Sequence, residues 1–227
     1  AQALGARVGG VALGAYGDIA TLSFSSPKII STGQGGAVII PERAPLCDGG
    51  DASCDDDPSA NASRLAAAVR VLKNFGRRAS GADEYVEARG LNLKFTDLQA
   101  VVGLEQMKKL PARVARMRAM WFAYRRGLEG VDGLTMLDAP ESDPGWIPWF
   151  VDVRVDDGPE AREDLALFLK QHGIGTRSMY PRLSHQPALR EHAGAAAQRA
   201  HAAVQRAADS MLFLPSSTSY DDSAVDL

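Results

Sequence analysis

The sequence has few cysteines, no long apolar run and no strong excess of charge of either sign. Its two cysteines, Cys47 and Cys54, cannot build a disulfide framework, and their spacing is not a usual zinc pattern. No apolar segment approaches the roughly 20 residues that span a bilayer, and no signal peptide is apparent. With 25 basic and 28 acidic residues the formal net charge is −3, which gives no electrostatic case for binding nucleic acid. These absences predict a soluble, cytoplasmic protein with neither a membrane nor a nucleic acid as partner.

Both ends of the sequence look cut. It opens on Ala1-Gln2-Ala3 without an initiator methionine, and it stops just after residues 220–223, which read as the start of another helix. We therefore expect a piece of a longer protein whose site lacks some members. Its 227 residues still suffice to bury a core.

The first half of the chain predicts two strands, a glycine-rich turn and several helices. Residues 19–24 and 37–40 have strand character, with the turn at residues 25–36 between them. Residues 42–61 are rich in Asp, Gly, Ser and Pro and predict a solvated loop. Apolar spacing predicts a helix over residues 64–75, a helix capped by Thr96 or Asp97, and a further helix with Pro111 in its first turn that runs to about Gly127.

The second half has the pattern of a small α/β domain. Its boundary is expected near residues 115–130. The spacing predicts strands over residues 146–155, 174–180 and 211–214, and helices over residues 160–172 and 193–209.

Lys28 is the most informative single residue. It follows a strand, comes directly after Pro27 and leads into the glycine-rich turn, which is an unusual place for a solvated lysine. A lysine amine held in a partly desolvated pocket can form a Schiff base, and the nearby hydroxyls of Ser23, Ser25 and Ser26 could bind a phosphate. A lone lysine among serines is more often an exposed loop residue, so residue types alone favour that ordinary interpretation.

The other candidates are weaker. The glycines of residues 32–36 fit neither a P-loop nor a Gly-x-Gly-x-x-Gly pattern, because a strand follows them. The four histidines lack metal-ligand spacing, and the acidic run at residues 55–57 lacks the alternating ligands of a calcium loop. The aromatic residues Trp146, Trp149 and Phe150 are expected to pack in a core.

Several motifs, in order along nearly the whole chain, together resemble the sugar-nucleotide aminotransferases of the DegT/StrS type. They are QALGA at residues 2–6, GDI at 17–19, LSFS at 22–25, PKIISTGQGG at 27–36, LKNFGR at 72–77, GLNLKFTDLQA at 90–100, GLEQ at 103–106, WFVDV at 149–153, GIGTR at 173–177 and LPS at 214–216. The turn around Lys28 looks most like the perosamine-synthase-like branch. The resemblance implies an α/β fold, the pyridoxal 5′-phosphate (PLP)-dependent transferase fold type I. It divides the chain into part of the large domain (residues 1–118) and a small C-terminal domain (residues 119–227).

The resemblance also implies roles for single residues. Lys28 matches the lysine that holds PLP covalently and then moves protons, and Ser23 matches the serine that binds the cofactor phosphate. Gln2 matches the residue that contacts the phenolic oxygen of the pyridine ring. Asn92 matches an asparagine that reaches the phosphate of the other subunit's cofactor, so the active site would belong to a homodimer. Lys94 stands where the family often has an arginine near the same phosphate.

The chain departs from the family pattern at three places. The family's aspartate that protonates the pyridine nitrogen would fall just before Ala1. The segment 42–61 is longer than usual, and Ser184 stands where the family commonly has a histidine, beside His185.

Two functions are therefore expected from different classes. The first is a PLP-dependent aminotransferase that moves an amino group from an amino acid, with glutamate the expected donor, to a nucleotide-linked keto-deoxy sugar. The second is a truncated, non-catalytic paralogue acting as a dimerisation or regulatory module. A related sugar dehydratase carries histidine in place of this lysine, so Lys28 favours transamination.

Overall fold

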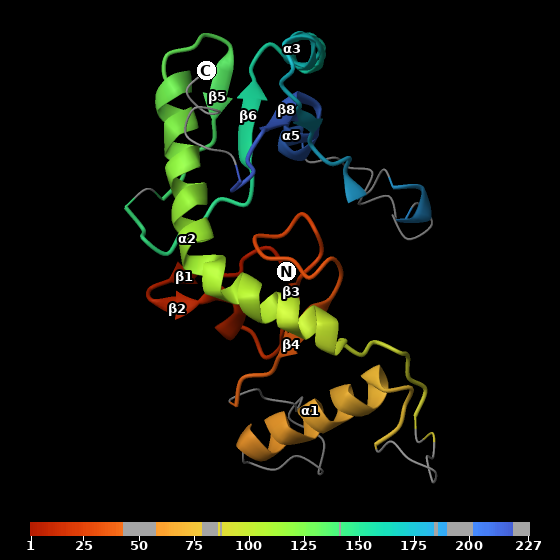
Figure 1. Cartoon of the computed structure of the whole chain (residues 1–227). Helices are drawn as coiled ribbons and strands as arrows, with labels where there is room; N and C mark the ends of the chain where they lie inside the picture. The colour runs from red at the N-terminus through yellow and green to blue at the C-terminus, as the bar shows by residue number, and fades with distance from the viewer. Residues whose placement is uncertain are drawn as a thin grey trace. The chain divides into compact units, whose positions relative to one another are not determined.

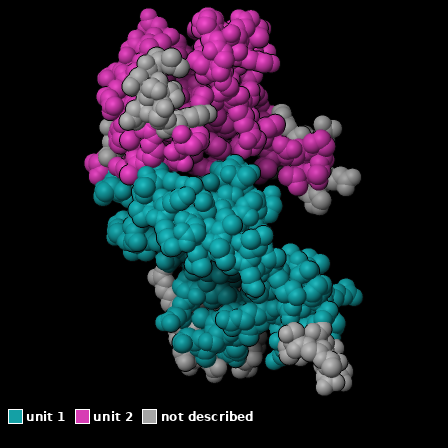
Figure 2. Space-filling view, in the orientation of Figure 1, with its two compact units in different colours: residues 1–114, 143–147 teal, residues 115–142, 148–227 magenta. Residues whose placement is uncertain are grey.

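The computed structural model describes residues 1–42, 58–78, 86, 88–140, 142–183, 186–189 and 202–219 (Figure 1). The chain divides into two compact units (Figure 2). The first comprises residues 1–114 and 143–147, and the second comprises residues 115–142 and 148–227. The division falls inside the long helix α2 (Asp97–Leu128). The predicted domain limits at residues 118 and 119 stay a prediction.

The first unit contains two small antiparallel pairs of strands. Strands β3 (Ala20–Ser23) and β4 (Gly36–Ile39) pair so that Ser23 lies opposite Gly36, which confirms both predicted strands to within about a residue. Strands β1 (Arg7–Val8) and β2 (Val11–Ala12) form a hairpin that the sequence analysis missed. Its two loop residues, Gly9 and Gly10, have φ values of 55° and 80°, as a two-residue turn between twisted strands requires. A short 3-10 helix, η1 (Leu13–Ala15), follows β2.

Helix α1 (Pro58–Lys73) begins six residues before the predicted start at residue 64, so the prediction of a loop through residue 61 is wrong at its end. The proline content of residues 42–61 favours a loop, but proline is also favoured in the first helical turn, where its missing N–H is not needed. The next turn is tied down because Arg64 Nη2 donates to the Oδ1 of the buried Asn61 at 2.5 Å. Residues 43–57, including Cys47 and Cys54, lie outside the described residues.

The prediction of two helices divided at Pro111 is wrong, because α2 runs unbroken from Asp97 to Leu128 with Pro111 inside it. A proline in a helix removes one backbone hydrogen bond and strains one turn. Here the neighbouring turns are rich in Leu, Met, Lys, Arg and Ala, which are strong helix formers, and they outweigh that single break. The predicted start is confirmed: Thr96 caps the helix, as shown by its bonds with Gln99.

The second unit is built on a four-stranded antiparallel sheet. Its strand order is β5-β6-β8-β7, from β5 (Leu134–Met136), β6 (Val151–Val155), β8 (Met211–Leu214) and β7 (Arg177–Ser178). Helices α3 (Pro159–Gln171) and α5 (Ala202–Ser210) both pack against β6. Val153, Val155 and Leu212 form the buried centre of this unit. The 3-10 helix η3 (Pro187–Leu189) lies between β7 and α5 in the chain.

The predictions for this unit are confirmed for some elements and wrong for others. Strand β8 and helix α3 match the sequence analysis, whereas β5 was missed. The strand predicted from residue 146 begins only at Val151, because residues 143–147 belong to the first unit, where Arg7 N donates to Gly145 O at 2.8 Å. Only Arg177–Ser178 of the strand predicted over residues 174–180 pairs with β8. The helix predicted over residues 193–209 is described only from residue 202 on, because residues 193–201 lie outside the described part of the chain.

Candidate active site on the loop between β3 and β4

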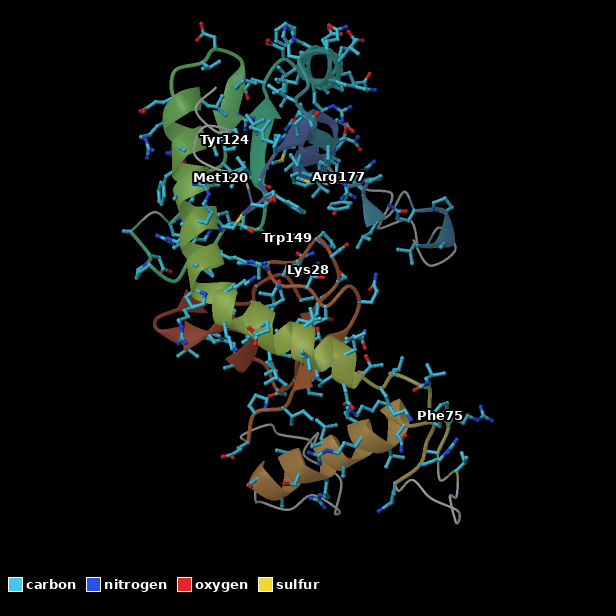
Figure 3. The ribbon with its side chains drawn as sticks, viewed as in Figure 1. Lys28, Phe75, Met120, Tyr124, Trp149 and Arg177 are labelled. Atoms are coloured by element: carbon cyan, nitrogen blue, oxygen red, sulfur yellow. The ribbon has the colours of Figure 1, made fainter. Side chains whose placement is uncertain are left out.

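Lys28 lies on the loop that joins β3 to β4 and is half-buried there (Figure 3). Its backbone N–H donates to Ser25 O at 3.1 Å, which forms a turn on the N-terminal side of the lysine. The base of the loop is closed by two hydrogen bonds, from Phe24 N to Gly35 O and from Thr32 N to Phe24 O, both at 2.9 Å. Ile30, which is 1% exposed, anchors the loop in the interior. The lysine is thus held on an ordered, partly buried turn.

The glycines after Lys28 are required by space as well as by backbone angle. Gly35 has a φ of 140°, and a Cβ placed on it would lie 2.3 Å from Cε2 of Phe95. A Cβ on Gly36 would lie 2.6 Å from the carbonyl oxygen of Leu22. The Phe95 ring packs edge-on against Phe24, with centroids 6.1 Å apart. The loop can therefore close onto β3 and Phe95 only with glycine at these positions.

Two serine hydroxyls lie together at the start of this loop. Ser23 Oγ and Ser25 Oγ are 3.3 Å apart, both residues are half-buried, and the backbone N–H of Ser25 lies 3.5 Å from Ser23 Oγ. Two hydroxyls and a backbone N–H can all donate to one phosphate. The local chain thus places donors that could hold a phosphate within five residues of the Lys28 amine, and such a donor set would fit PLP.

Gln2 belongs to the same unit and is exposed. The amino nitrogen of the preceding residue, Ala1, donates to Thr21 O at 2.6 Å. This contact places the Gln2 segment beside strand β3, the strand that ends in Ser23.

Asn92 and Lys94 lie on the segment that passes beside the end of α1. Leu91 N and Leu93 N donate to the carbonyls of Leu72 and Lys73 at 2.9 Å, and Asn92 bridges to Asn74. Both candidate residues are exposed. Figure 3 shows Phe75, beside the end of α1, well separated from Lys28 in this view. Phe95, the residue after Lys94, packs against Phe24 and Gly35 of the Lys28 loop, so this segment runs from the end of α1 to that loop.

Phe75 organises the positive charge around Lys94. Its φ of 58° is rare for a residue with a side chain. Lys94 Nζ and Arg77 Cζ lie 4.9 Å and 4.7 Å from the centre of its ring. The ring holds two cations close together by cation–π attraction, which suits an anionic partner.

Two side chains of α2 that contact the Lys28 loop were missed by the sequence analysis. Gln99 Nε2 donates to Gln34 O at 2.8 Å, and Arg113 Nη1 donates to Ile29 O at 2.8 Å. A polar residue on a helix carries no sign of which carbonyl it will reach, since that depends on how the helix packs against the loop. Only the placement of both residues on one side of α2 could have suggested a shared contact.

The second unit has features of its own. Burial raises the pKa of the half-buried Asp152 on β6. Phe150 packs against Trp149 and Phe213, with ring centroids 4.2 and 4.7 Å apart. Trp149 and Phe150 thus make the expected aromatic contacts, but both side chains are half-buried rather than in the core. Ser184 and His185 lie outside the described residues.

Within the described part of the chain, no group of three or more His, Cys, Asp or Glu could hold a metal, and no helix is long and apolar enough to cross a membrane.

These features fit part of an aminotransferase of fold type I. The model of the DegT/DnrJ/EryC1/StrS aminotransferase family matches residues 1–45 and 48–226. The chain belongs to this family. The predicted family and the predicted fold class are therefore confirmed.

The relatives include both dehydratases and aminotransferases. A dTDP-4-dehydro-2,6-dideoxy-D-glucose 3-dehydratase of Saccharopolyspora spinosa is 33% identical over 79% of this chain and 40% of its own length. A dTDP-4-dehydro-2,3,6-trideoxy-D-glucose 4-aminotransferase of the same organism is 31% identical over 99% of this chain and 54% of its own length. The chain thus spans about half the length of the curated relatives it matches.

A solved structure supports the fold. Spr1654 of Streptococcus pneumoniae, named a putative sugar aminotransferase and solved in its PLP form, superposes with a TM-score of 0.80 over 100% of this chain and 53% of its own. Its sequence identity is 20%, so this likeness concerns the fold alone.

Proposed function

We propose that the full-length protein is a PLP-dependent aminotransferase. It would move the amino group of an amino acid, glutamate being the expected donor, to the keto carbon of a nucleotide-linked keto-deoxy sugar, in the cytoplasm. The observation that carries this proposal is Lys28 on the ordered loop beside Ser23 and Ser25, in a chain of this family. Its assignment to the perosamine-synthase-like branch is a further prediction.

The residues of the chain have separate tasks in this proposal. When bound, PLP supplies an electron sink for the carbon that loses its proton. Lys28 holds the cofactor through Nζ and, once released by the donor amine, takes and returns protons at the same nitrogen. The hydroxyls of Ser23 and Ser25 and the Ser25 N–H bind the phosphate, and the Gln2 amide orients the ring by donating to its phenolic oxygen.

The overall reaction balances without an outside oxidant. The amino acid gives up its amino group and the hydrogen on its α-carbon, takes an oxygen from water and becomes a 2-oxo acid. The sugar's keto carbon takes up the amino group and one hydrogen, loses its oxygen as water and becomes an amine, so no net water is used. Because the two half-reactions are mirror images, one lysine can serve both as base and as acid.

We further propose that Asn92 and Lys94 bind the phosphate of the partner subunit's cofactor in a homodimer. Their exposure supports this role. Exposed apolar side chains lie nearby on α2, with Leu98, Leu104 and Val101 exposed by 77%, 65% and 60%. Apolar clusters of this kind commonly mark protein interfaces.

Mixed dimers test the shared site. Co-expressed full-length Lys28→Ala and Asn92→Ala proteins, each inactive alone, should regain activity when mixed. One site of the heterodimer then has an intact Lys28 from one chain and an intact Asn92 from the other. If Asn92 served its own chain's site, both sites of the heterodimer would be damaged and no activity would return.

A sugar dehydratase is the second candidate, because a dehydratase is among the relatives. Lys28 favours transamination, since the related dehydratases are expected to carry histidine there. A third possibility is the non-catalytic module, which would keep the dimer surface without turnover.

Product analysis separates these functions. The full-length protein is incubated with PLP, each of several amino acids and a dTDP- or GDP-linked 4-keto-6-deoxy sugar, and the sugar products are identified by mass spectrometry. We expect an amino sugar and an equal amount of 2-oxo acid, both lost in Lys28→Ala and retained in Lys108→Ala, a matched variant of an exposed α2 lysine. A dehydrated sugar without 2-oxo acid would favour the dehydratase, and no product at all would favour the module.

A further inference from the structure

One side of α2 contacts the loop that carries Lys28. We call this side the loop-facing stripe; its members are Gln99, Gly103, Gln106 and Arg113. Their separations of four, three and seven residues place them on one face of a helix. The polar members are half-buried, whereas Leu98, Val101 and Leu104 on other faces are exposed.

The stripe contacts the loop at three points along its length. Gln99 Nε2 donates to Gln34 O near the end of the loop. At Gly103 an added Cβ would lie 3.2 Å from Cγ2 of Thr32, so the helix and the loop approach closely there. At the other end Arg113 Nη1 donates to Ile29 O at 2.8 Å.

Arg113 acts on the backbone directly beside the lysine. The carbonyl that accepts from Arg113 belongs to Ile29, the residue after Lys28. The backbone N–H of Lys28 itself donates to Ser25 O. The same Nη1 donates its second hydrogen to Gln106 Oε1 at 2.7 Å, so the guanidinium cannot swing away without losing two bonds. A charged donor makes a stronger bond to a carbonyl than a neutral donor does.

We infer that Arg113 is a positioning residue for Lys28, with Gln106 holding the guanidinium in place. The inference rests on the proposed function. Arg113 fixes the peptide between Ile29 and Ile30, and thereby limits the directions from which the Lys28 side chain can leave the loop. Its removal loosens the loop and slows the attack of Nζ on PLP, because fewer loop conformations aim the amine at the cofactor.

The test uses the full-length protein, first without PLP. Hydrogen exchange is followed at the amides of Lys28 and Thr32, whose hydrogen bonds hold the loop closed. In Arg113→Met we expect exchange about tenfold faster, the factor expected from losing a charge-assisted bond to a partly exposed carbonyl. Arg126→Met, an exposed position near the end of the same helix, is the matched control and should exchange like the wild type.

The second readout is the rate at which PLP labels Lys28, trapped with borohydride at short times and mapped by mass spectrometry. We expect labelling about tenfold slower in Arg113→Met and about threefold slower in Gln106→Leu. Arg113→Lys should recover part of the rate, because it keeps one donor but lacks the planar fork. The lysine and leucine variants keep the test valid if Arg113→Met fails to fold.

The outcomes separate this inference from the function on which it rests. Wild-type labelling at Lys28 together with equal rates in Arg113→Met contradicts the positioning role and leaves the aminotransferase proposal standing. Faster loop exchange with unchanged labelling also contradicts it. Absence of label on wild-type Lys28 contradicts the proposed function and this inference together.

Discussion

Replacing Gly35 by alanine should damage the Lys28 loop more than the same change at Gly33, although both glycines have positive φ values. The φ of Gly33 is 81°, and an added Cβ there would meet nothing within 4 Å. The φ of Gly35 is 140°, and its added Cβ would lie 2.3 Å from Phe95 Cε2 and 3.1 Å from Thr32 Oγ1. Both substitutions carry strain from a positive φ, and only the one at Gly35 also meets steric overlap.

The difference can be given a magnitude. Positive φ costs a residue with a Cβ about 1–2 kcal/mol, and forcing an extra carbon into a filled site costs about 1–3 kcal/mol more. We expect Gly33→Ala to lower the free energy of unfolding by about 1–2 kcal/mol and Gly35→Ala by about 2–5 kcal/mol. The overlap would push Phe95 away from Phe24, its edge-on neighbour.

Urea denaturation of the full-length variants without PLP measures these costs. The double variant Gly35→Ala/Phe95→Leu should recover part of the Gly35→Ala loss relative to Phe95→Leu alone, because the smaller side chain makes room for the methyl group. Equal costs at Gly33 and Gly35, or no recovery in the double variant, would refute the reasoning that Phe95 fills the space beside Gly35.

Three further predictions concern a helix cap and two carboxyl groups. Thr96→Ala should destabilise the protein by about 1 kcal/mol in urea denaturation, with Thr96→Ser close to wild type, because Thr96 Oγ1 caps α2 at Gln99 N; equal losses in both variants would contradict this. Burial raises the pKa of Asp152 above its ordinary 3.8, so wild-type stability should rise relative to Asp152→Asn as the pH falls from neutral toward that value, and a fall would contradict the prediction. The Thr135 hydroxyl, 2.7 Å from Asp156 Oδ2, and Arg154 together lower the pKa of Asp156. Thr135→Val should therefore raise the Asp156 pKa in an NMR titration. An unchanged pKa would contradict the prediction and show that Arg154 alone is enough to lower it.

Several elements of the fold could be predicted from the local spacing of apolar residues. Strands β3, β4 and β8 and helix α3 follow apolar spacing, and Thr96 marks the start of α2. The two-residue strands β1 and β2 are too short to show a period, although the Gly9-Gly10 turn was a usable signal. Pro58 suits the first turn of α1, although the residues before it favour a loop. Pro111 lies inside α2 because the helix formers around it outweigh one lost hydrogen bond.

The candidate site shows a similar division. Lys28, Ser23 and Ser25 are close in sequence, so a motif can reveal them. The family resemblance then implied the role of the lysine as the residue that holds PLP. Gln99 and Arg113 reach the loop from 65 and 84 residues away from their acceptors, and no local pattern encodes such contacts. The roles of Gln2, Asn92 and Lys94 stay predictions, because each depends on a cofactor and, for Asn92 and Lys94, on a second subunit.

The most direct test of the central claim asks whether Lys28 binds PLP covalently. The full-length protein and its Lys28→Ala variant are incubated with PLP and reduced with borohydride, and the modified peptides are mapped by mass spectrometry. We expect one label per chain, on Lys28 of the wild type and absent from the variant. A folded wild-type protein that carries no label on Lys28, or a label retained by Lys28→Ala at another lysine with equal yield, would contradict the claim.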